Sequence, residues 1–388
     1  MNEIVVVGAS LAGAATARAL RDAGYAGGLT VVGDEPHAPY DRPPLSKSFL
    51  LGDIHEADLA LVDAAEDLDV AWRIGARAVA LEATTRTLVL DDGAQLRPDG
   101  IVLATGASAL RLPATEALEG IHVLRTLDHA LALRGALAAA RRAVVIGSGF
   151  IGCEVAATAR RLGIDVTLVG LEETPLAVAL GTEMGAAVGA LHGDNGVVFE
   201  QAMVAGFEGE ERVRAVVLAD GRRLEADVVV VGIGARPAVG WLEGSGLTVD
   251  DGVVCDERGA TGTSGIVAVG DCARWHDERR GHPHRHEHWT SASEQAAVAA
   301  ATLLGAEPAR GLRAPYFWSD LFDSRLQVAG WPDEADRVSI EEGTPEERSF
   351  LALYRRGEDV VGVLALDRGR SFTRWRRTLD RAAIPAAA

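Results

Sequence analysis

The stretch IVVVGASLAG at residues 4–13 decides the fold of the N-terminal part of this chain. Its apolar run ends in a glycine-rich turn. An alanine-rich stretch typical of a helix follows to about residue 23, and a second apolar run at residues 29–32 leads to Asp34. Strand, turn, helix, strand and acid in this order form the pattern of a dinucleotide-binding βαβ unit. The turn must be small because the pyrophosphate binds at the free N–H groups of the helix N-terminus.

A second and complete copy of this pattern, AVVIGSGFIG, occupies residues 143–152. A helical stretch to about residue 162 and an apolar run at residues 165–169 follow it. One glycine-rich turn is a weak signal, whereas two such turns at the heads of βαβ units predict two bound dinucleotides. In a single chain this pairing favours FAD together with a nicotinamide cofactor.

The remaining patterns place these units in a larger architecture. Apolar runs at residues 101–104 and 228–231 are predicted to close the two units, and the run at 266–271 is predicted to be a strand that returns to the first. After about residue 313 the pattern changes to alternating strands and one arginine-rich helix. We therefore predict an α/β fold with two nested Rossmann-like dinucleotide-binding domains, similar to glutathione reductase, and a C-terminal α+β domain. The predicted FAD-binding domain covers residues 1–113 and 243–312, the NAD-binding domain 114–242 and the C-terminal domain 313–388.

Composition narrows the classes of function. The chain has 56 acidic and 38 basic residues and a formal charge of −18, which disfavours binding to nucleic acids or anionic membranes. No apolar run is long enough to predict a membrane span, and the first residues enter a strand pattern without a signal peptide. The three cysteines are isolated in sequence, which suits a cytoplasmic protein and predicts no metal centre made by this chain. Five of the ten histidines fall within residues 276–288, where a solvated loop is favoured over a metal site.

Five segments together carry a family resemblance. The most specific is PYDRPPLSK at residues 39–47, and the others are ATG at 104–106, GFIGCE at 149–154, VGD at 269–271 and PYFWSD at 315–320. With these segments the chain resembles the FAD-dependent, pyridine-nucleotide ferredoxin reductases that serve Rieske dioxygenases and bacterial haem monooxygenases, the putidaredoxin reductase type. The resemblance implies a flavoprotein that takes a hydride from NADH and passes single electrons to a [2Fe–2S] ferredoxin.

The resemblance also implies an FAD site in the first unit. Arg42 suits the pyrophosphate, because its planar fork binds phosphate through two hydrogen bonds. Asp34 lies at the offset where an acid binds the ribose hydroxyls. Asp271 would bind the ribityl chain, and Trp289 would lie near the pyrimidine end of the flavin. The expected FAD-binding residues are Gly8, Ser10, Gly13, Asp34, Arg42, Lys47, Thr105, Gly106, Gly270, Asp271 and Trp289.

Lys47 is the one lysine of the sequence, and the family pattern pairs it with Glu154 beside the flavin ring. Hydride transfer to the flavin places negative charge on the ring, so a nearby ammonium stabilises the reduced form. The resemblance therefore implies catalytic roles for Lys47 and Glu154. A buried structural ion pair is the alternative interpretation.

The second glycine-rich turn is expected to bind the nicotinamide cofactor. Gly170 stands where NADH-preferring members usually carry an acid; Glu172 and Glu173 follow, and one of them, with Glu172 as the first candidate, is expected to take its place. Residues 171–180 contain no arginine that could bind a 2′-phosphate, so NADH is favoured over NADPH, although the choice stays open. The residues expected at this cofactor are Gly147, Gly149, Gly152, Glu172, Gly232 and Gly234.

The electron acceptor is predicted from cysteines that are missing. Disulfide reductases of this architecture carry a CxxxxC after the first acid, and NADH peroxidases or oxidases carry a single cysteine there. Residues 43–52 of this chain contain none. We therefore expect an external ferredoxin, bound transiently by a monomer or weak homodimer. The alternatives are a rubredoxin reductase, an NADH oxidase, or an NADH-sensing flavoprotein that acts through a partner.

The charge distribution predicts where the ferredoxin binds. Residues 1–330 carry 28 basic and 45 acidic residues, whereas residues 331–388 carry 10 and 11. Ferredoxins are typically acidic, so the nearly neutral C-terminal part is the favoured docking surface. Trp318 is expected between flavin and ferredoxin, with ordinary core packing as the alternative. The candidate docking arginines are Arg368, Arg370, Arg374, Arg376 and Arg377.

Overall fold

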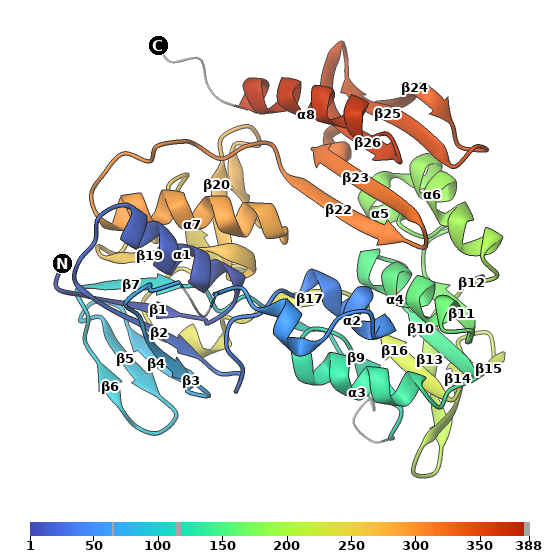
Figure 1. The fold of residues 1–388 in the computed structure, drawn as a ribbon, viewed down its shortest axis with the longest axis horizontal. Coiled ribbons are helices and arrows are strands. Elements are labelled where there is room, and N and C mark those ends of the chain that lie inside the picture. The colour runs from blue at the N-terminus through green and yellow to red at the C-terminus, as the bar shows by residue number, and fades with distance from the viewer. Residues whose placement is uncertain (64–65, 114–117, 384–388) are drawn as a thin grey trace.

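The computed structural model describes residues 1–63, 66–113 and 118–383. Its first glycine-rich turn belongs to a parallel sheet with the order β19-β7-β1-β2-β3. Helices α1 (Leu11–Asp22) and α7 (Trp289–Leu303) pack on one face, and the antiparallel sheet β4-β5-β6 packs against the other (Figure 1). Because both faces are covered, its central strands are continuous apolar runs. The strands are β1 (Glu3–Val7), β2 (Gly28–Gly33), β3 (Ala71–Ile74), β4 (Ala78–Glu82), β5 (Thr87–Leu90), β6 (Gln95–Leu96), β7 (Gly100–Leu103) and β19 (Ile266–Ala268).

The second turn belongs to a sheet of the same design, with the order β12-β11-β10-β16-β9. Alternate residues of β10 point to opposite faces. Val145 packs under the helices, whereas Val144 packs on the antiparallel sheet β13-β14-β15. The helices are α3 (Leu127–Leu137), α4 (Phe150–Arg161), α5 (Ala177–Leu180) and α6 (Thr182–Asp194). The strands are β9 (Ile121–Val123), β10 (Arg142–Ile146), β11 (Asp165–Gly170), β12 (Val198–Gln201), β13 (Val204–Gly209), β14 (Val213–Leu218), β15 (Arg223–Glu225) and β16 (Val228–Val231).

The second unit is inserted into the first. Strands β8 (Ala107–Ala109) and β17 (Ala235–Pro237) pair antiparallel where the chain leaves the first unit and returns to it. After β18 (Val253–Cys255), strand β19 pairs with β7 and completes the first sheet. The predicted return of the run at residues 266–271 to the first unit is therefore confirmed, as is the two-unit α/β design, but the strand covers only residues 266–268, and Gly270–Cys272 form a short 3-10 helix. The residue bounds given above for the domains stay predictions.

The C-terminal part is an antiparallel sheet, β22-β23-β26-β25-β24, with α8 (Gly369–Ala383) packed on it (Figure 1). The apolar runs at residues 326–330, 351–354 and 360–366 and the arginine-rich stretch at about 371–381 predict β23, β25, β26 and α8, whereas no run predicts β22 or β24. Both missed strands form the edges of the sheet, and polar residues interrupt their apolar pattern, so that neither shows the signal of a buried strand. The bounds are β22 (Tyr316–Leu321), β23 (Ser324–Gly330), β24 (Arg337–Thr344), β25 (Ser349–Arg356) and β26 (Asp359–Leu366).

The histidine-rich segment is not the solvated loop that we predicted. Strands β20 (Ala273–Asp277) and β21 (His282–His284) form a hairpin, and the ring of His288 stacks on Phe317 at 4.9 Å between centroids. Pairing between β20 and β21 satisfies the backbone hydrogen-bonding groups of this polar segment. The polarity of its side chains does not reveal such a pairing. Among the described residues no cluster of histidine, cysteine or acidic side chains could hold a metal ion. No helix in the described ranges has the length and apolar character needed to cross a membrane.

Candidate functional site

The first glycine-rich turn is closed so tightly that only glycine fits. A Cβ at Gly8, where φ is +123°, would lie 2.0 Å from the carbonyl oxygen of Ala104, and a Cβ at Gly13 would lie 1.8 Å from that of Gly8. Ser10 takes the extended backbone of an N-cap, and no side chain among the described residues caps α1. The first N–H groups of α1 therefore lack a capping partner, as a phosphate site requires.

The second turn repeats these contacts. A Cβ at Gly147 would lie 2.2 Å from the oxygen of Gly232, and one at Gly152 would lie 1.8 Å from that of Gly147. Gly149 takes the place of Ser10 as the N-cap of α4, which likewise has no side-chain cap in the described part of the chain. We call the turns at residues 8–13 and 147–152 the first and the second cradle. Both fit the pyrophosphate of a dinucleotide, so Ser10 in place of a glycine does not change the phosphate site.

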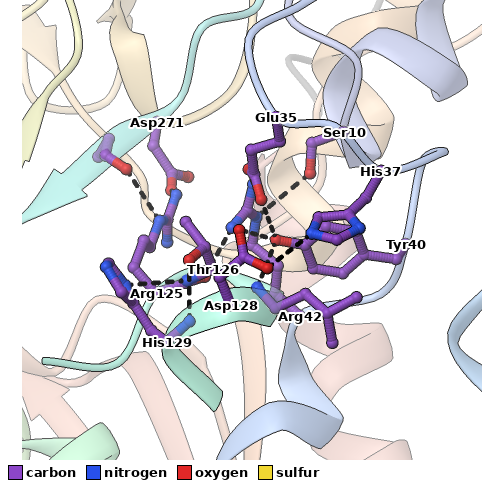
Figure 2. Close-up of polar contacts among 12 residues, drawn as sticks. Ser10, Glu35, His37, Tyr40, Arg42, Arg125, Thr126, Asp128, His129 and Asp271 are labelled. Carbon is purple, nitrogen blue, oxygen red and sulfur yellow. Dashed lines mark hydrogen bonds and ion pairs between the residues drawn. The ribbon is translucent and has the colours of Figure 1, made fainter. Parts of the chain in front are cut away.

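A network of polar side chains lies beside the first cradle (Figure 2). Arg42 donates through Nε to Ser10 Oγ at 3.2 Å and through Nη2 to Glu35 Oε1 at 2.6 Å. Tyr40 donates its hydroxyl to the other oxygen of Glu35, and burial raises the pKa of this tyrosine. Asp34, the acid that the sequence singled out, is exposed at the end of β2. Glu35, which the sequence analysis did not assign, orients Arg42 toward the turn.

A second ion pair closes the other side of this region. Arg125 donates to Asp271 at 2.7 Å and to the carbonyl oxygen of Ala107 at 2.9 Å (Figure 2). Gly270, just before Asp271, donates its N–H to the buried side chain of Gln295. The turn at Thr105 and Gly106 lies near this pair, because a Cβ at Gly106 would lie 3.5 Å from the Arg125 guanidinium. No sequence signal marked Arg125, since its place depends on the pairing of β9 in the second sheet.

Lys47 and Glu154 form the ion pair that the resemblance implied. The Nζ–Oε2 distance is 2.8 Å, and only 4% of the Glu154 side chain is exposed. Glu154 also accepts hydrogen bonds from Ser46 and, at 2.7 Å, from Ser319. The hydroxyls of Ser46 and Ser319 were not assigned by the sequence analysis.

A cavity of about 270 Å³ opens beside Lys47. Trp318 lines it, and the indole of Trp289 lies 6.2 Å from that of Trp318. Trp289 is the first residue of α7 and donates to Asp41 at 2.8 Å. Burial raises the pKa of the Asp41 carboxyl. The Trp289 indole is exposed, whereas Trp318 is partly buried: it lines the cavity and also packs against the core of the C-terminal sheet. The lining includes Asp41, Lys47, Ser48, Thr158, Arg161, Trp318 and Asp320.

The structure explains why Gly170 stands where an acid is usual at the second cradle. A Cβ at Gly170 would lie 2.3 Å from Ser148 Oγ, so this chain has no room for an acid at that position. Glu172, the predicted replacement, is exposed just after β11. Its contact with a ribose stays a prediction.

The cysteines and the docking arginines complete the predicted set. All three cysteines are buried and free, and burial raises the pKa of Cys153, Cys255 and Cys272. The candidate docking arginines, four in α8 and Arg368 just before it, differ in exposure. Arg370, Arg374 and Arg377 are exposed, whereas Arg376 stacks 3.9 Å above the ring of Tyr316. Arg368 donates to the carbonyl oxygen of Ser349.

Comparisons with known proteins agree with this geometry. The family model "Pyridine nucleotide-disulphide oxidoreductase" matches residues 2–296, and the model "Reductase C-terminal" matches residues 316–388. The chain is 38% identical to the ferredoxin reductase component of chlorobenzene dioxygenase from Cupriavidus sp. (strain PS12), over 100% of this chain and 94% of that protein. It is 36% identical to putidaredoxin reductase from Pseudomonas putida, over 97% of this chain and 92% of that protein. A crystal structure of the covalent putidaredoxin reductase–putidaredoxin complex matches with a TM-score of 0.94 and 35% identity, over 98% of this chain and 93% of that one.

Proposed function

This chain belongs to the pyridine nucleotide-disulphide oxidoreductase family, within its ferredoxin reductases, and we propose that it is an NADH-dependent reductase that holds FAD and reduces a [2Fe–2S] ferredoxin. One observation carries the proposal. The chain has two glycine-rich turns of the same geometry, and Lys47, from the segment after Arg42, pairs with the buried Glu154, from the helix after the second turn, which also contacts Ser319 of the C-terminal domain. When bound, FAD accepts the hydride of NADH and releases its two electrons singly.

The first cradle would hold FAD. The N–H groups at the start of α1 and the Arg42 guanidinium face the same turn, so both can bind the pyrophosphate. Glu35 holds Arg42 in place, which leaves Asp34 for the ribose hydroxyls. Asp271 would orient the ribityl chain with Arg125 at its back. Trp289, Thr105 and Gly106 would border the ring.

The second cradle would hold NADH. Gly147, Gly149 and Gly152 would hold the pyrophosphate at the N-terminus of α4, and Gly234, whose φ is +111°, would border the nicotinamide. With no arginine in residues 171–180 and Glu172 nearby, the adenosine end favours a free 2′-hydroxyl over a 2′-phosphate. The carbonyl oxygen of Gly232 lies against Gly147 of this turn.

Lys47 would stabilise the charge that develops when the hydride arrives. Its ammonium lies at the edge of a cavity and is held by Glu154 at 2.8 Å. A preorganised cation needs no reorientation during the reaction, which is the main source of electrostatic catalysis. Glu154 acts by keeping the ammonium in place.

The electrons would leave through an external protein. The buried cysteines have raised pKa values and none lies in residues 43–52, so the chain offers no thiolate at the first cradle. Trp318 and the exposed arginines Arg370, Arg374 and Arg377 would contact the ferredoxin. A terminal oxygenase of the Rieske or the haem type would consume these electrons.

Stopped-flow reduction of the FAD-loaded protein by NADH and by NADPH tests the first half-reaction. Cytochrome c reduction with a panel of [2Fe–2S] ferredoxins tests the second. We expect rapid flavin reduction by NADH and turnover that depends on added ferredoxin. Turnover with oxygen alone would instead indicate an oxidase, and turnover with rubredoxin alone a rubredoxin reductase. A long-lived reduced complex that no carrier oxidises would indicate an NADH sensor.

A further inference from the structure

Helix α4 of the second unit carries a stripe of three residues, Phe150, Glu154 and Thr158, that contacts two other parts of the molecule. Residues four positions apart lie on one face of a helix. Phe150 packs edge-on against Phe317 with 4.6 Å between centroids, and Thr158 donates to the carbonyl oxygen of Ser46 at 2.7 Å. The stripe therefore joins α4 both to the C-terminal domain and to the segment that carries Lys47.

Strand β22 meets this stripe with alternate residues. Phe317 and Ser319 are two apart in the strand and face α4, whereas Trp318 lines the cavity beside Lys47. Figure 1 shows β22 lying alongside α4. The same strand thus presents an indole to the cavity and a hydroxyl to the carboxylate that holds Lys47.

The two oxygens of Glu154 have different partners. Oε2 accepts from Ser46 Oγ and from Lys47 Nζ, and Oε1 accepts from Ser319 Oγ at 2.7 Å. Ser319 is fully buried, and Glu154 is 3% exposed. A buried carboxylate is stable only when its oxygens are hydrogen-bonded. Ser319 therefore satisfies Oε1 by donating a hydrogen bond to it, although the two residues are 165 positions apart in the sequence.

We propose that Ser319 is a positioning residue for hydride transfer: by holding Glu154 Oε1, it turns Oε2 toward Lys47 and fixes the ammonium beside the flavin site. This inference rests on the proposed function. It gives the C-terminal domain a part in flavin reduction in addition to ferredoxin docking. Without the hydroxyl, Oε1 has lost its partner, and the carboxylate can rotate to share both oxygens with Lys47. The ammonium is then drawn toward Glu154 and away from the ring.

The test compares Ser319→Ala with wild type in the FAD-loaded full chain. We expect a more negative midpoint potential of the bound flavin, because the reduced form loses its cation, and flavin reduction by NADH slower by roughly threefold to tenfold. KM for ferredoxin should not change. The matched control is Ser371→Ala, which removes a hydroxyl that donates to Glu342 at 2.6 Å in the same domain, away from α4.

A second background separates positioning from general packing. In the Lys47→Met variant, adding Ser319→Ala should not shift the midpoint potential of the flavin any further, because the cation that Ser319 positions is already absent. A further shift there, or an unchanged potential and rate in folded Ser319→Ala, would overturn the proposal. If Ser319→Ala does not retain FAD, Ser319→Cys keeps the volume with a weaker donor. It should shift the potential in the same direction, and a wild-type potential would overturn the proposal. Because the potential is measured without ferredoxin, this result stands apart from failure of the proposed acceptor.

Discussion

Arg125 Nη2 lies 2.7 Å from Asp271 Oδ2, although the two residues are 146 positions apart in the sequence (Figure 2). Arg125 follows β9 of the second sheet, and Asp271 follows β19 of the first. The pair therefore connects the two nucleotide-binding units at the point where the flavin is proposed to lie. Its geometry depends on the completion of both sheets.

Loss of this pair should weaken FAD binding. Arg125→Ala leaves the partly buried Asp271 carboxylate without its counter-ion, a loss of about 1–3 kcal/mol. If that loss falls on the FAD complex, FAD binds roughly five- to 150-fold more weakly. Flavin fluorescence after dilution measures the release. Arg142→Ala is the matched control, because its ion pair with Glu225 is exposed and should contribute little. Equal FAD retention by both variants would contradict the role given to Arg125.

Lys47→Arg tests whether the ammonium acts in the reaction. The guanidinium keeps the positive charge but cannot occupy the same compact position against Glu154. We expect flavin reduction by NADH to slow by about tenfold or more, with FAD still bound. Stopped-flow loss of the flavin absorbance measures the rate. A wild-type rate would reduce Lys47 to a structural ion pair.

Gly170 and Ser148 should determine together how the adenosine ribose is bound. Gly170→Glu alone introduces a Cβ that would lie 2.3 Å from Ser148 Oγ, so we expect a destabilised variant without a better KM for NADH. Gly170→Glu with Ser148→Gly removes the clash and should lower KM for NADH relative to NADPH. Steady-state kinetics with both cofactors give the comparison. If the single substitution already improves KM, the steric explanation is wrong.

Charge reversal on α8 should weaken ferredoxin binding and leave the reduction of the flavin by NADH unchanged. Arg374 and Arg377 are exposed, and Arg374 pairs at the surface with Glu342. We expect Arg374→Glu with Arg377→Glu to raise KM for ferredoxin about tenfold at low salt, and less at high salt. NADH–ferricyanide turnover should stay unchanged. Reversal of Arg222 and Arg223, in the second unit, serves as the control.

His288 should make stability fall in mildly acidic solution. Burial, followed by the nearby charge of His286, lowers the pKa of His288 from 6.5 to about 4. The unfolded chain therefore binds a proton more readily than the folded one between these values. This contribution to stability is complete above pH 6.5 and is lost as the pH falls toward 4, by at most about 3 kcal/mol. Urea unfolding at pH 5 and pH 7.5 should show a smaller difference in His288→Gln than in wild type. If the difference in stability between the two pH values is the same in both proteins, a group other than His288 causes the pH dependence.

The sequence by itself determined the parts of this protein that depend on local contacts. A Cβ at Gly13 meets the carbonyl oxygen of Gly8, five residues away, and Gly152 stands in the same relation to Gly147, so the backbone of each turn dictates its own residue types. Buried parallel strands likewise dictate continuous apolar runs. The two cradles, the central strands and the long helices could therefore be predicted, and the family segments added the pairing of Lys47 with Glu154.

The tertiary structure decided the contacts whose partners lie far apart in the chain. Arg125 reaches Asp271 only because β9 and β19 complete different sheets, and Ser319 reaches Glu154 only because an edge strand lies on α4. Glu35 rather than Asp34 engages Arg42, because the chain turns at the end of β2. A polar side chain has no periodic signal of its own. Its partner is set by the packing of whole elements, which no local stretch of sequence encodes.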